Sequence, residues 1–245
     1  MQSEEFKKLA QQLKSNLSRL MEKRSTWESH WQECADYMQP RKAEITKERA
    51  RGDKRNIQIF DATAIRALEL LAASLHGMLT SSANRWFSLR YKEDQLNDSD
   101  EAKEWLQDAT DKMYLAFARS NFQQEIFELY HELLAFGTSA MFITDDIKDD
   151  LRFKTIHISE IFITENEKGM VDCLVRKFKI KNKNIALMYP DAQLPANLLT
   201  KIKNAPHDDT EIIHSVHASD NPMGYENSKN MDFISCHVHE ESGVI

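Results

Sequence analysis

Residues 121–144 read NFQQEIFELYHELLAFGTSAMFIT and contain the point at which the chain changes from helix to strand. Apolar residues first recur at steps of three and four, which predicts a helix with one apolar face. They are Phe122, Ile126, Leu129, Tyr130 and Leu133. Asn121 and Gln124 resemble a capping box at the helix start. Gly137 is suited to end the helix, because glycine adopts positive φ without strain. From Ser139 onward the apolar period changes to two, which indicates strands.

Upstream of this point the sequence predicts three further helical segments. Residues 3–38 carry an apolar stripe and should form one long helix, unless Ser25-Thr26 caps a second one. Asp61 is expected to cap the next helix, and Ser99 the helix after that. The expected core face of the helix after Asp61 consists of Ile65, Leu68, Leu71, Ala72, Leu75, Met78 and Leu79.

Downstream of Gly137, alternating segments predict strands. They are Ser139–Thr144, Leu151–Ile158, Ile161–Thr164, Met170–Ile180, Glu211–Ala218 and Met231–Glu241. Short helices are expected near 182–189 and after Pro195. Because helices come first and strands second, we predict an α+β fold with a mostly antiparallel β region. The chain thus divides into a mainly helical part, 1–138, and a mainly β part with short helices, 139–245.

Composition and charge bound the class of protein. The chain has 245 residues, of which 41% are hydrophobic and 29% charged, with a formal net charge of −7. These values predict a globular protein with a core, and the acidic balance argues against a nucleic-acid coat protein. Three cysteines lie far apart without a CxxC pair, which indicates no disulfide framework. No apolar run approaches the ~20 residues of a membrane-spanning helix, so we expect no membrane partner.

Two places are candidates for contact with DNA or with another subunit. Residues 41–55 hold seven basic and three acidic residues, and we interpret them as a solvated, mobile loop that could touch phosphates. The candidate contacts in this loop are Arg49, Arg51, Lys54 and Arg55. Trp86 and Phe87 could stack on bases. Core packing or subunit contact is the favoured interpretation of this pair, because aromatic side chains bury much area.

The sequence offers no site for covalent chemistry. GxSxG, P-loop, GxGxxG and HExxH motifs are missing. His237 and His239 would share one strand face beside His214 and His217, but a metal site needs three or four converging ligands. The acidic run Asp145–Asp150 lacks the glycine and terminal glutamate of an EF-hand loop, and we interpret it as a hairpin turn. We therefore expect no catalytic residue, metal or cofactor.

Three blocks stand out by their order and spacing. The first is WQECADYMQP at 31–40, and the second runs from IFDATAI at 59–65 to Trp86-Phe87-Ser-Leu89. The third joins SNF at 120–122 to LLAFGT at 133–138. Together with a strand region from 158 to 178, they resemble the head-to-tail connector, or portal, proteins of short-tailed bacteriophages. The similarity extends over about residues 20–240.

The resemblance implies a structural subunit of a twelve-fold ring at one vertex of a phage capsid, without catalytic residues. Such rings pass double-stranded DNA through a central channel, without sequence specificity, during packaging and ejection. The implied partners are further copies of the chain, the packaging terminase, capsid or scaffold proteins and tail proteins. The implied location is the virion, or the bacterial cytoplasm for a prophage remnant.

Members of this family are typically much longer, and their stem helix and clip follow the matched region. The resemblance therefore implies that residues 1–245 are one N-terminal, wing-like region without stem and clip, from a truncated or split gene. The alternative is a protein-binding module from a decayed prophage gene, which binds a partner through its long N-terminal helix and moves no DNA. An enzyme, such as a nuclease that uses the acidic turns, ranks below both.

Overall fold

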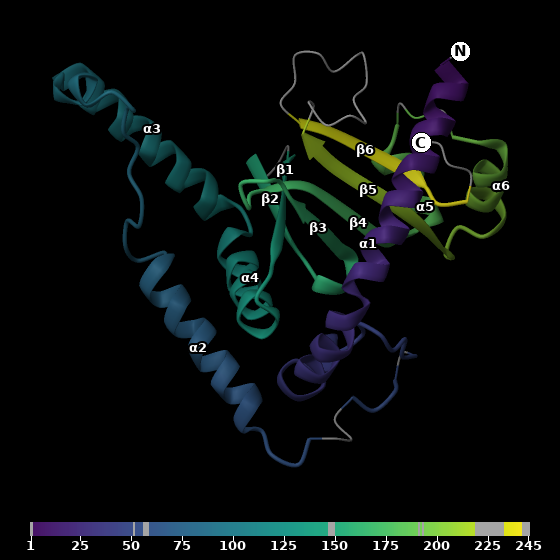
Figure 1. The fold of residues 1–245 in the computed structure, drawn as a ribbon. Helices are drawn as coiled ribbons and strands as arrows, with labels where there is room; N and C mark the ends of the chain where they lie inside the picture. Colours follow the sequence, from purple (N-terminus) through teal and green to yellow (C-terminus); the bar gives the residue numbers. More distant parts are fainter. Residues whose placement is uncertain are drawn as a thin grey trace. The chain divides into compact units, whose positions relative to one another are not determined.

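The computed structural model describes residues 2–50, 52–55, 59–146, 150–190, 192, 194–218 and 233–241, with the side chains of 2–6 and 95 left aside. The chain divides into two compact units, which are described separately. The first is formed by Met1–Trp27 with Glu160–Ile245, and the second by Glu28–Ser159. Long helices come early in the chain and antiparallel sheets later (Figure 1), so the predicted α+β class is confirmed.

The first unit contains an antiparallel sheet of four described strands with the order β3-β4-β5-β6. The strands are β3 (Ile161–Glu165), β4 (Val171–Lys181), β5 (Asp209–Ala218) and β6 (Phe233–His239). Consecutive strands pair with one another, so the sheet is a meander. These strands were predicted, with small differences at their ends. Met231 lies outside the described residues.

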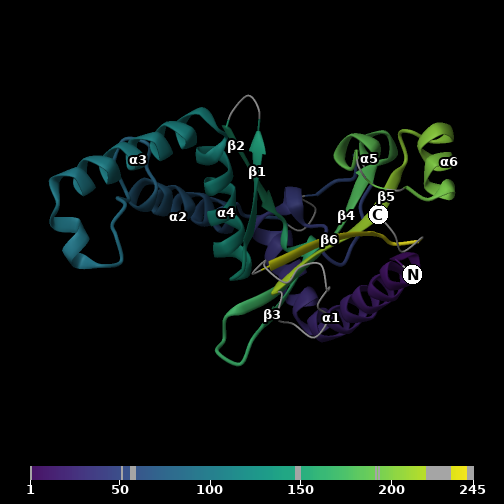
Figure 2. The same ribbon diagram turned by 90° about the horizontal axis from the view of Figure 1, so that it is seen from above.

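Helix α1 (Gln2–Met38) covers one face of this sheet with its first half (Figure 2). It continues through Ser25 and Thr26, so the alternative of a second helix is wrong. Leu13 is 1% exposed, and a leucine buried to this degree stabilises a fold by about 1.5–3 kcal/mol. The buried core here consists of Leu9, Ala10, Leu13, Leu17, Leu20, Phe162, Cys173, Val175, Ile213 and Val238.

Two short helices, α5 (Asn182–Met188) and α6 (Ala196–Asn204), lie over the opposite face of the sheet (Figure 2). Successive strand residues point to opposite faces, so Ile212 of β5 faces away from α1 while Ile213 faces it. Ile212 is buried, as are the apolar residues Ile185 and Leu198 of the two helices. The predicted short helices are confirmed.

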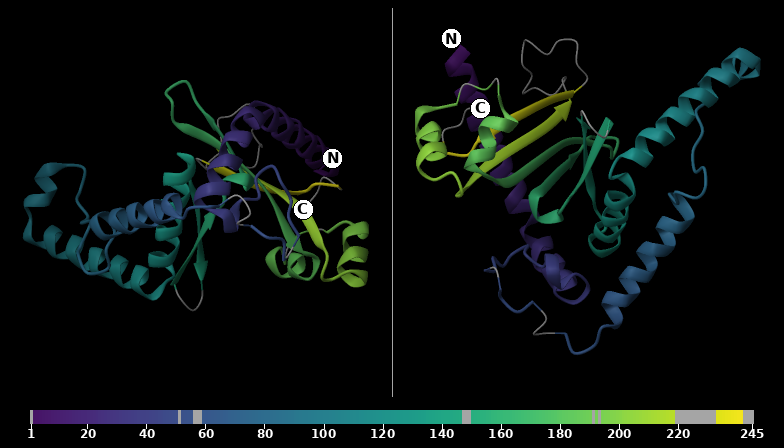
Figure 3. Two further views of the ribbon diagram at one scale, coloured as in Figure 1. Left: turned by 90° about the horizontal axis from the view of Figure 1, so that it is seen from below. Right: turned by 180° about the vertical axis from the view of Figure 1, so that it is seen from behind.

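The second unit is mainly helical. Helix α4 (Phe122–Phe136) contacts α2 (Thr63–Leu79), α3 (Asp100–Arg119) and the hairpin, and therefore lies at its centre (Figure 3). The hairpin pairs β1 (Ala140–Asp146) with β2 (Asp150–Ile156), as the acidic turn predicted, although Asp149 lies outside the described residues. The 3-10 helices are η1 (Pro40–Lys42), η2 (Asp94–Asp98) and η3 (Ile158–Glu160).

Gly137 ends α4 as predicted, with φ of 75° and its N–H donating to the Leu133 carbonyl at 2.9 Å. The capping box at the other end of α4 is wrong, because Asn121 makes no capping bond. Its side-chain amide instead donates to the Phe153 carbonyl at 2.8 Å and accepts from the Phe153 N–H at 2.9 Å. Asn121 therefore joins α4 to the hairpin.

The starts of α2 and α3 differ from one another. The Asp61 carboxylate accepts the Thr63 N–H at 2.8 Å, so it supports the start of α2 from the position before the N-cap. Ser99 occupies the N-cap of α3 but makes no side-chain capping bond. Asp100 and Glu101 follow it in the first turn, where acidic side chains interact favourably with the helix dipole.

The predicted core face of α2 is only partly buried. Leu68 and Ala72 are buried, but Leu71 is 50% exposed and Met78 73% exposed, and Leu79 is exposed as well. The prediction that this whole face is core is therefore wrong, because the described neighbours of α2 cover only part of the stripe. None of the helices in the described ranges combines the length and the apolar character that a membrane crossing requires.

Candidate functional site

One buried glutamine attaches the basic segment 41–55 to α1. The Gln32 side chain donates to the Ala43 carbonyl at 3.0 Å and accepts the N–H groups of Ile45 and Thr46 at 3.1 and 2.9 Å. Three backbone groups of the segment are thus satisfied by a single side chain, as groups taken out of water require. The prediction of a loop that is only solvated is therefore wrong for residues 43–49.

A buried carboxylate receives two of the cations of this segment. Asp36 accepts Lys47 Nζ at 3.1 Å and Arg49 Nη2 at 2.9 Å, and it also accepts the Gln32 amide at 3.0 Å. A buried carboxylate needs such partners, since leaving it unpaired is costly. Arg49 thus has a structural role within the chain, and its contact with DNA or a subunit stays a prediction.

The other basic residues of the segment differ in how they are paired. Lys42 bonds to Glu128 and lies 3.5 Å from Glu132 Oε1. Arg55 pairs with Glu44 at 2.7 Å. Lys54 is exposed, and no hydrogen bond or ion pair joins its side chain to a residue that the structure describes. Arg51 lies outside the described residues.

The carboxyl of Glu132 is the strongly perturbed group of this region. Burial raises its pKa to about 7, and the nearby Lys42 ammonium opposes the rise. The Ile158 N–H donates to Glu132 Oε2 at 3.4 Å. Glu132 therefore connects α4 to η1 and to the end of the hairpin, and its charge varies near neutral pH.

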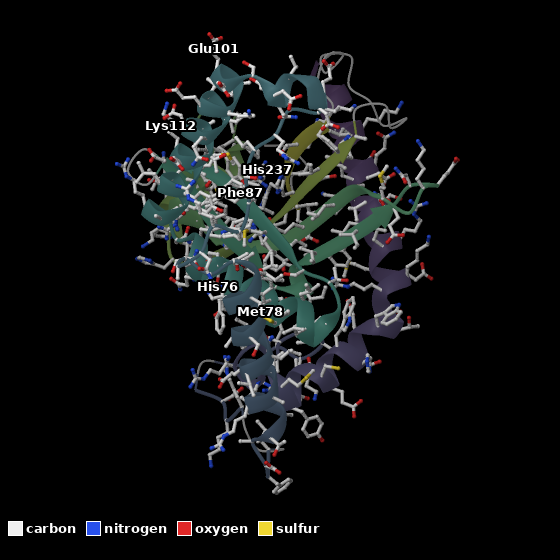
Figure 4. All side chains as sticks on the ribbon, turned by 90° about the vertical axis from the view of Figure 1, so that its left-hand side faces the viewer. His76, Met78, Phe87, Glu101, Lys112 and His237 are labelled. Carbon is white, nitrogen blue, oxygen red and sulfur yellow. The ribbon has the colours of Figure 1, made fainter. Side chains whose placement is uncertain are left out.

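Trp86 and Phe87 belong to an aromatic cluster between α3, α4 and the hairpin. The Trp86 ring stacks on the Phe122 ring with centroids 5.9 Å apart and planes at 7°. The Phe87 ring stacks on Tyr114 at 4.4 Å and 23° (Figure 4 labels Phe87). Such pairs stabilise a fold beyond the area that they bury. The cluster consists of Trp86, Phe87, Tyr114, Phe117, Phe122 and Phe153.

The Tyr114 hydroxyl fixes the backbone of this aromatic pair. It accepts the N–H groups of Trp86 and Phe87 at 2.6 and 2.8 Å and donates to the Phe87 carbonyl at 3.0 Å. One donor and two acceptor positions are thereby used, which is the full capacity of a hydroxyl. Both rings pack within this unit. Contact of the exposed part of Trp86 with DNA or a subunit stays a prediction.

The histidines of the sheet form a stacked pair and not a converging set. His214 and His237 stack with centroids 3.9 Å apart and planes at 4°, while His217 projects from the opposite face. Burial, assisted by the nearby Arg176 guanidinium, lowers the pKa of His214 to about 3 and that of His237 to about 4. Across the described ranges, no group of three or more His, Cys, Asp or Glu side chains is placed to hold a metal ion.

Sequence reasoning missed the residues that position these surfaces. Gln32 and Asp36 lie one helical turn apart on α1, and a polar pair at this spacing was the available signal. Tyr114 of α3 carries no sequence signal of a polar role. Its hydroxyl partners come from a segment 27 and 28 residues away, so no local pattern indicated them.

Comparison with known proteins places this architecture in a family. The family described as "Bacteriophage head to tail connecting protein" matches residues 10–244. The "Portal protein" of Salmonella phage epsilon15 is 29% identical over 240 residues, covering 95% of this chain and 42% of the relative. The "Probable portal protein" of Bordetella phage BPP-1 is 36% identical over 169 residues, covering 69% of this chain and 30% of the relative. The chain thus spans less than half the length of either relative, and it belongs to the family of bacteriophage head-to-tail connecting proteins.

Proposed function

We propose that this chain is a structural subunit of a phage portal ring, of which residues 1–245 supply the wing-like region. The observation that carries the proposal, beside family membership, is the exposed part of the apolar face of α2. Soluble monomers rarely expose a contiguous face of this kind, and it typically marks an interface. Its large exposed side chains are Leu71, Met78 and Leu79.

In this proposal the work of the chain is geometric and not catalytic. Identical subunits that associate head to tail close into a ring when the rotation between neighbours permits it. Double-stranded DNA passes through the central channel during packaging and ejection, without sequence readout. A net charge of −7 favours such passage, because strong phosphate binding by every subunit would slow the movement of DNA.

The proposed partners and location are those that the resemblance to portal proteins implies. A portal ring occupies a vertex of the phage capsid, where it meets capsid or scaffold proteins, then the terminase that packages DNA, and later the tail. The named relatives are portal proteins of two phages. We extend their role to this chain on the strength of the match over residues 10–244. For a prophage remnant the location would be the bacterial cytoplasm.

Mass photometry and negative-stain microscopy of the purified chain test this proposal. We expect closed rings of about a dozen copies, as the resemblance implies, with association that strengthens with protein concentration. A monomer that persists at high protein concentration would contradict the proposal. Replacement of Leu71 and Met78 by Ser should abolish ring formation while the far-UV circular dichroism stays unchanged, because both side chains are exposed.

A protein-binding module is the second candidate, and exposed residues on α1 favour it. Met21 and Trp27 project from the part of α1 that belongs to the first unit, and both are exposed. A module of this kind would be monomeric and would bind one partner through α1. Loss of that partner on Trp27→Ala, in a chain that forms no rings, would support the module over the ring.

A further inference from the structure

The start of α3 presents an aromatic patch to solvent. Trp105 is 59% exposed and stacks on Tyr91 with centroids 6.1 Å apart and planes at 16°. Leu96 of η2, which packs against α3, is exposed too. Tryptophan and tyrosine are the residues that most often dominate binding energy at protein interfaces, where a polar rim surrounds them.

The rim of this patch is strongly acidic. Residues 93–111 hold eight carboxylates and one lysine, so the net charge of this segment is 1 − 8 = −7. Glu101 lies four residues before Trp105 and shares its side of the helix, whereas Asp108, three residues after Trp105, is paired with Lys112 at 2.6 Å. Figure 4 shows Glu101 and Lys112 projecting outward from α3. The patch thus suits a partner that offers cations to an aromatic surface.

The same unit carries a surface of opposite charge. Residues 41–55 hold seven basic and three acidic residues, a net charge of 7 − 3 = +4, but Lys42, Lys47, Arg49 and Arg55 are already paired with carboxylates of the same chain. Arg41 and Lys54 are both exposed, and neither side chain is paired with any residue in the described ranges. The described part of this segment and the start of α3 lie at opposite ends of the unit (Figures 1 and 3), so they do not meet within one copy.

We propose that the Trp105 patch of one copy receives the basic segment 41–55 of the next copy. Two different, complementary surfaces on one subunit make a head-to-tail contact, which is the kind that closes into rings. A guanidinium or ammonium over the Trp105 ring gains a cation–π interaction, and the surrounding carboxylates pair with the other bases. This inference deepens the proposed function, because it rests on ring assembly and names the surfaces that carry it.

Charge reversal on each surface tests the contact. Sedimentation velocity at low salt would compare the unaltered chain with Arg41→Glu/Lys54→Glu and with Glu101→Lys/Glu104→Lys. Each double variant should associate about tenfold more weakly or worse, since like charges then face one another. Trp105→Ala should weaken association as well. These side chains are exposed, so circular dichroism melts should match the unaltered chain.

Mixing the two charge-reversed variants tests most directly whether the acidic and basic surfaces contact each other. In an alternating assembly every contact pairs one acidic with one basic surface, so the equimolar mixture should regain the association that each variant alone has lost. The matched control is Lys154→Glu/Lys183→Glu, which makes the same charge change at two exposed lysines outside both surfaces. This control should associate as the unaltered chain does.

The outcomes separate this inference from the ring proposal. Rings of the unaltered chain together with no effect of either reversal would overturn the Trp105 contact and leave the ring proposal intact. Equal weakening by the Lys154/Lys183 control would also overturn it, because the effect would then be general charge repulsion. A mixture that stays dissociated while the unaltered chain associates would also overturn the Trp105 contact. A persistent monomer of the unaltered chain overturns both proposals.

Discussion

Helices α1 and α2 carry similar apolar stripes but end in different environments. Leu13 of α1 is 1% exposed and packs on the four-stranded sheet, whereas Leu71 of α2 is 50% exposed. The three- and four-residue spacing is the same in both helices. Periodicity therefore identifies an apolar face but does not identify what covers it. In α1 the sheet of the same chain covers the face, and in α2 we propose that a second copy does.

Truncation of one leucine in each helix tests this comparison with the largest expected effect. Leu13→Ala should lower the free energy of unfolding by about 2–5 kcal/mol, because it leaves a cavity in a packed core. Leu71→Ala should change it by less than about 0.5 kcal/mol, as exposed positions do. Urea unfolding followed by circular dichroism measures both. Equal losses would show that α2 is covered within the monomer.

Acid should weaken the first unit through its stacked histidines. The folded pKa values of about 3 for His214 and about 4 for His237 lie below the ordinary value of 6.5, so the unfolded state binds more protons below that pH. Stability should therefore fall between pH 6.5 and about 4, by about 1.4 kcal/mol per pH unit for each histidine. Chemical denaturation at several pH values measures this slope.

Single variants identify the responsible ring. His237→Phe keeps an aromatic ring that cannot take up a proton, so it should make the acid slope shallower. His207→Gln is the control, because His207 is exposed and should leave the slope as it is. An unchanged slope in His237→Phe would show that the pair does not cause the acid sensitivity.

The second unit should respond to pH in the opposite direction. The folded pKa of Glu132 is about 7 and its ordinary value is 4.5, so the folded state retains a proton that the unfolded state has lost between these values. This contribution is complete below pH 4.5 and is lost as pH rises through 7, by up to about 1.4 kcal/mol per pH unit. Glu132→Gln should make the loss of stability between pH 4.5 and 7 smaller. Glu128→Gln, which changes the other, exposed partner of Lys42, should preserve it.

The smallest expected effect comes from two glutamines in matched helical settings. Gln32 donates to Asp36, and Gln107 donates to Asp111, each at 3.0 Å and four residues apart. Gln32→Ala should cost about 1–3 kcal/mol, because it also leaves buried backbone groups of the basic segment without a partner. Gln107→Ala should cost little, since that pair is exposed.

Hydrogen exchange shows which backbone groups lose protection when Gln32 is replaced. The amides of Ile45 and Thr46 should lose protection in Gln32→Ala and keep it in Gln107→Ala. Unaltered protection in Gln32→Ala would show that the segment is held by the Asp36 ion pairs alone.

The local sequence pattern was sufficient to predict the order of helices and strands, but it was insufficient to predict which polar side chains bond to one another. Gly137 ends α4 because its φ of 75° is a local backbone requirement that one residue type meets best. Asn121 resembled a helix cap, yet it bonds to Phe153, which is 32 residues away. A short polar side chain can satisfy either a local or a distant backbone group, and only the position of the hairpin decides between them.

In the candidate site too, the sequence indicated local features but not the contacts between distant residues. Composition identified segment 41–55 as basic, and the large area that aromatic side chains bury favoured packing over base stacking for Trp86 and Phe87. The use of Arg49 against the buried Asp36 was not visible, because the two residues are joined only when the segment folds back on α1. The exposure of Trp105 could not be predicted either, since nothing in the sequence shows whether other parts of the chain cover an aromatic residue.

The amino-acid order alone was enough to predict the α+β class, the helix and strand segments and the family, because periodicity, turn residues and motif order are properties of neighbouring residues. The tertiary structure decided which apolar faces are covered, which charges are paired and which polar side chains are buried. These properties depend on distances between residues far apart in the chain, and such distances are set by packing. For this protein they separate an apolar stripe that the sheet covers, on α1, from one that stays partly exposed, on α2.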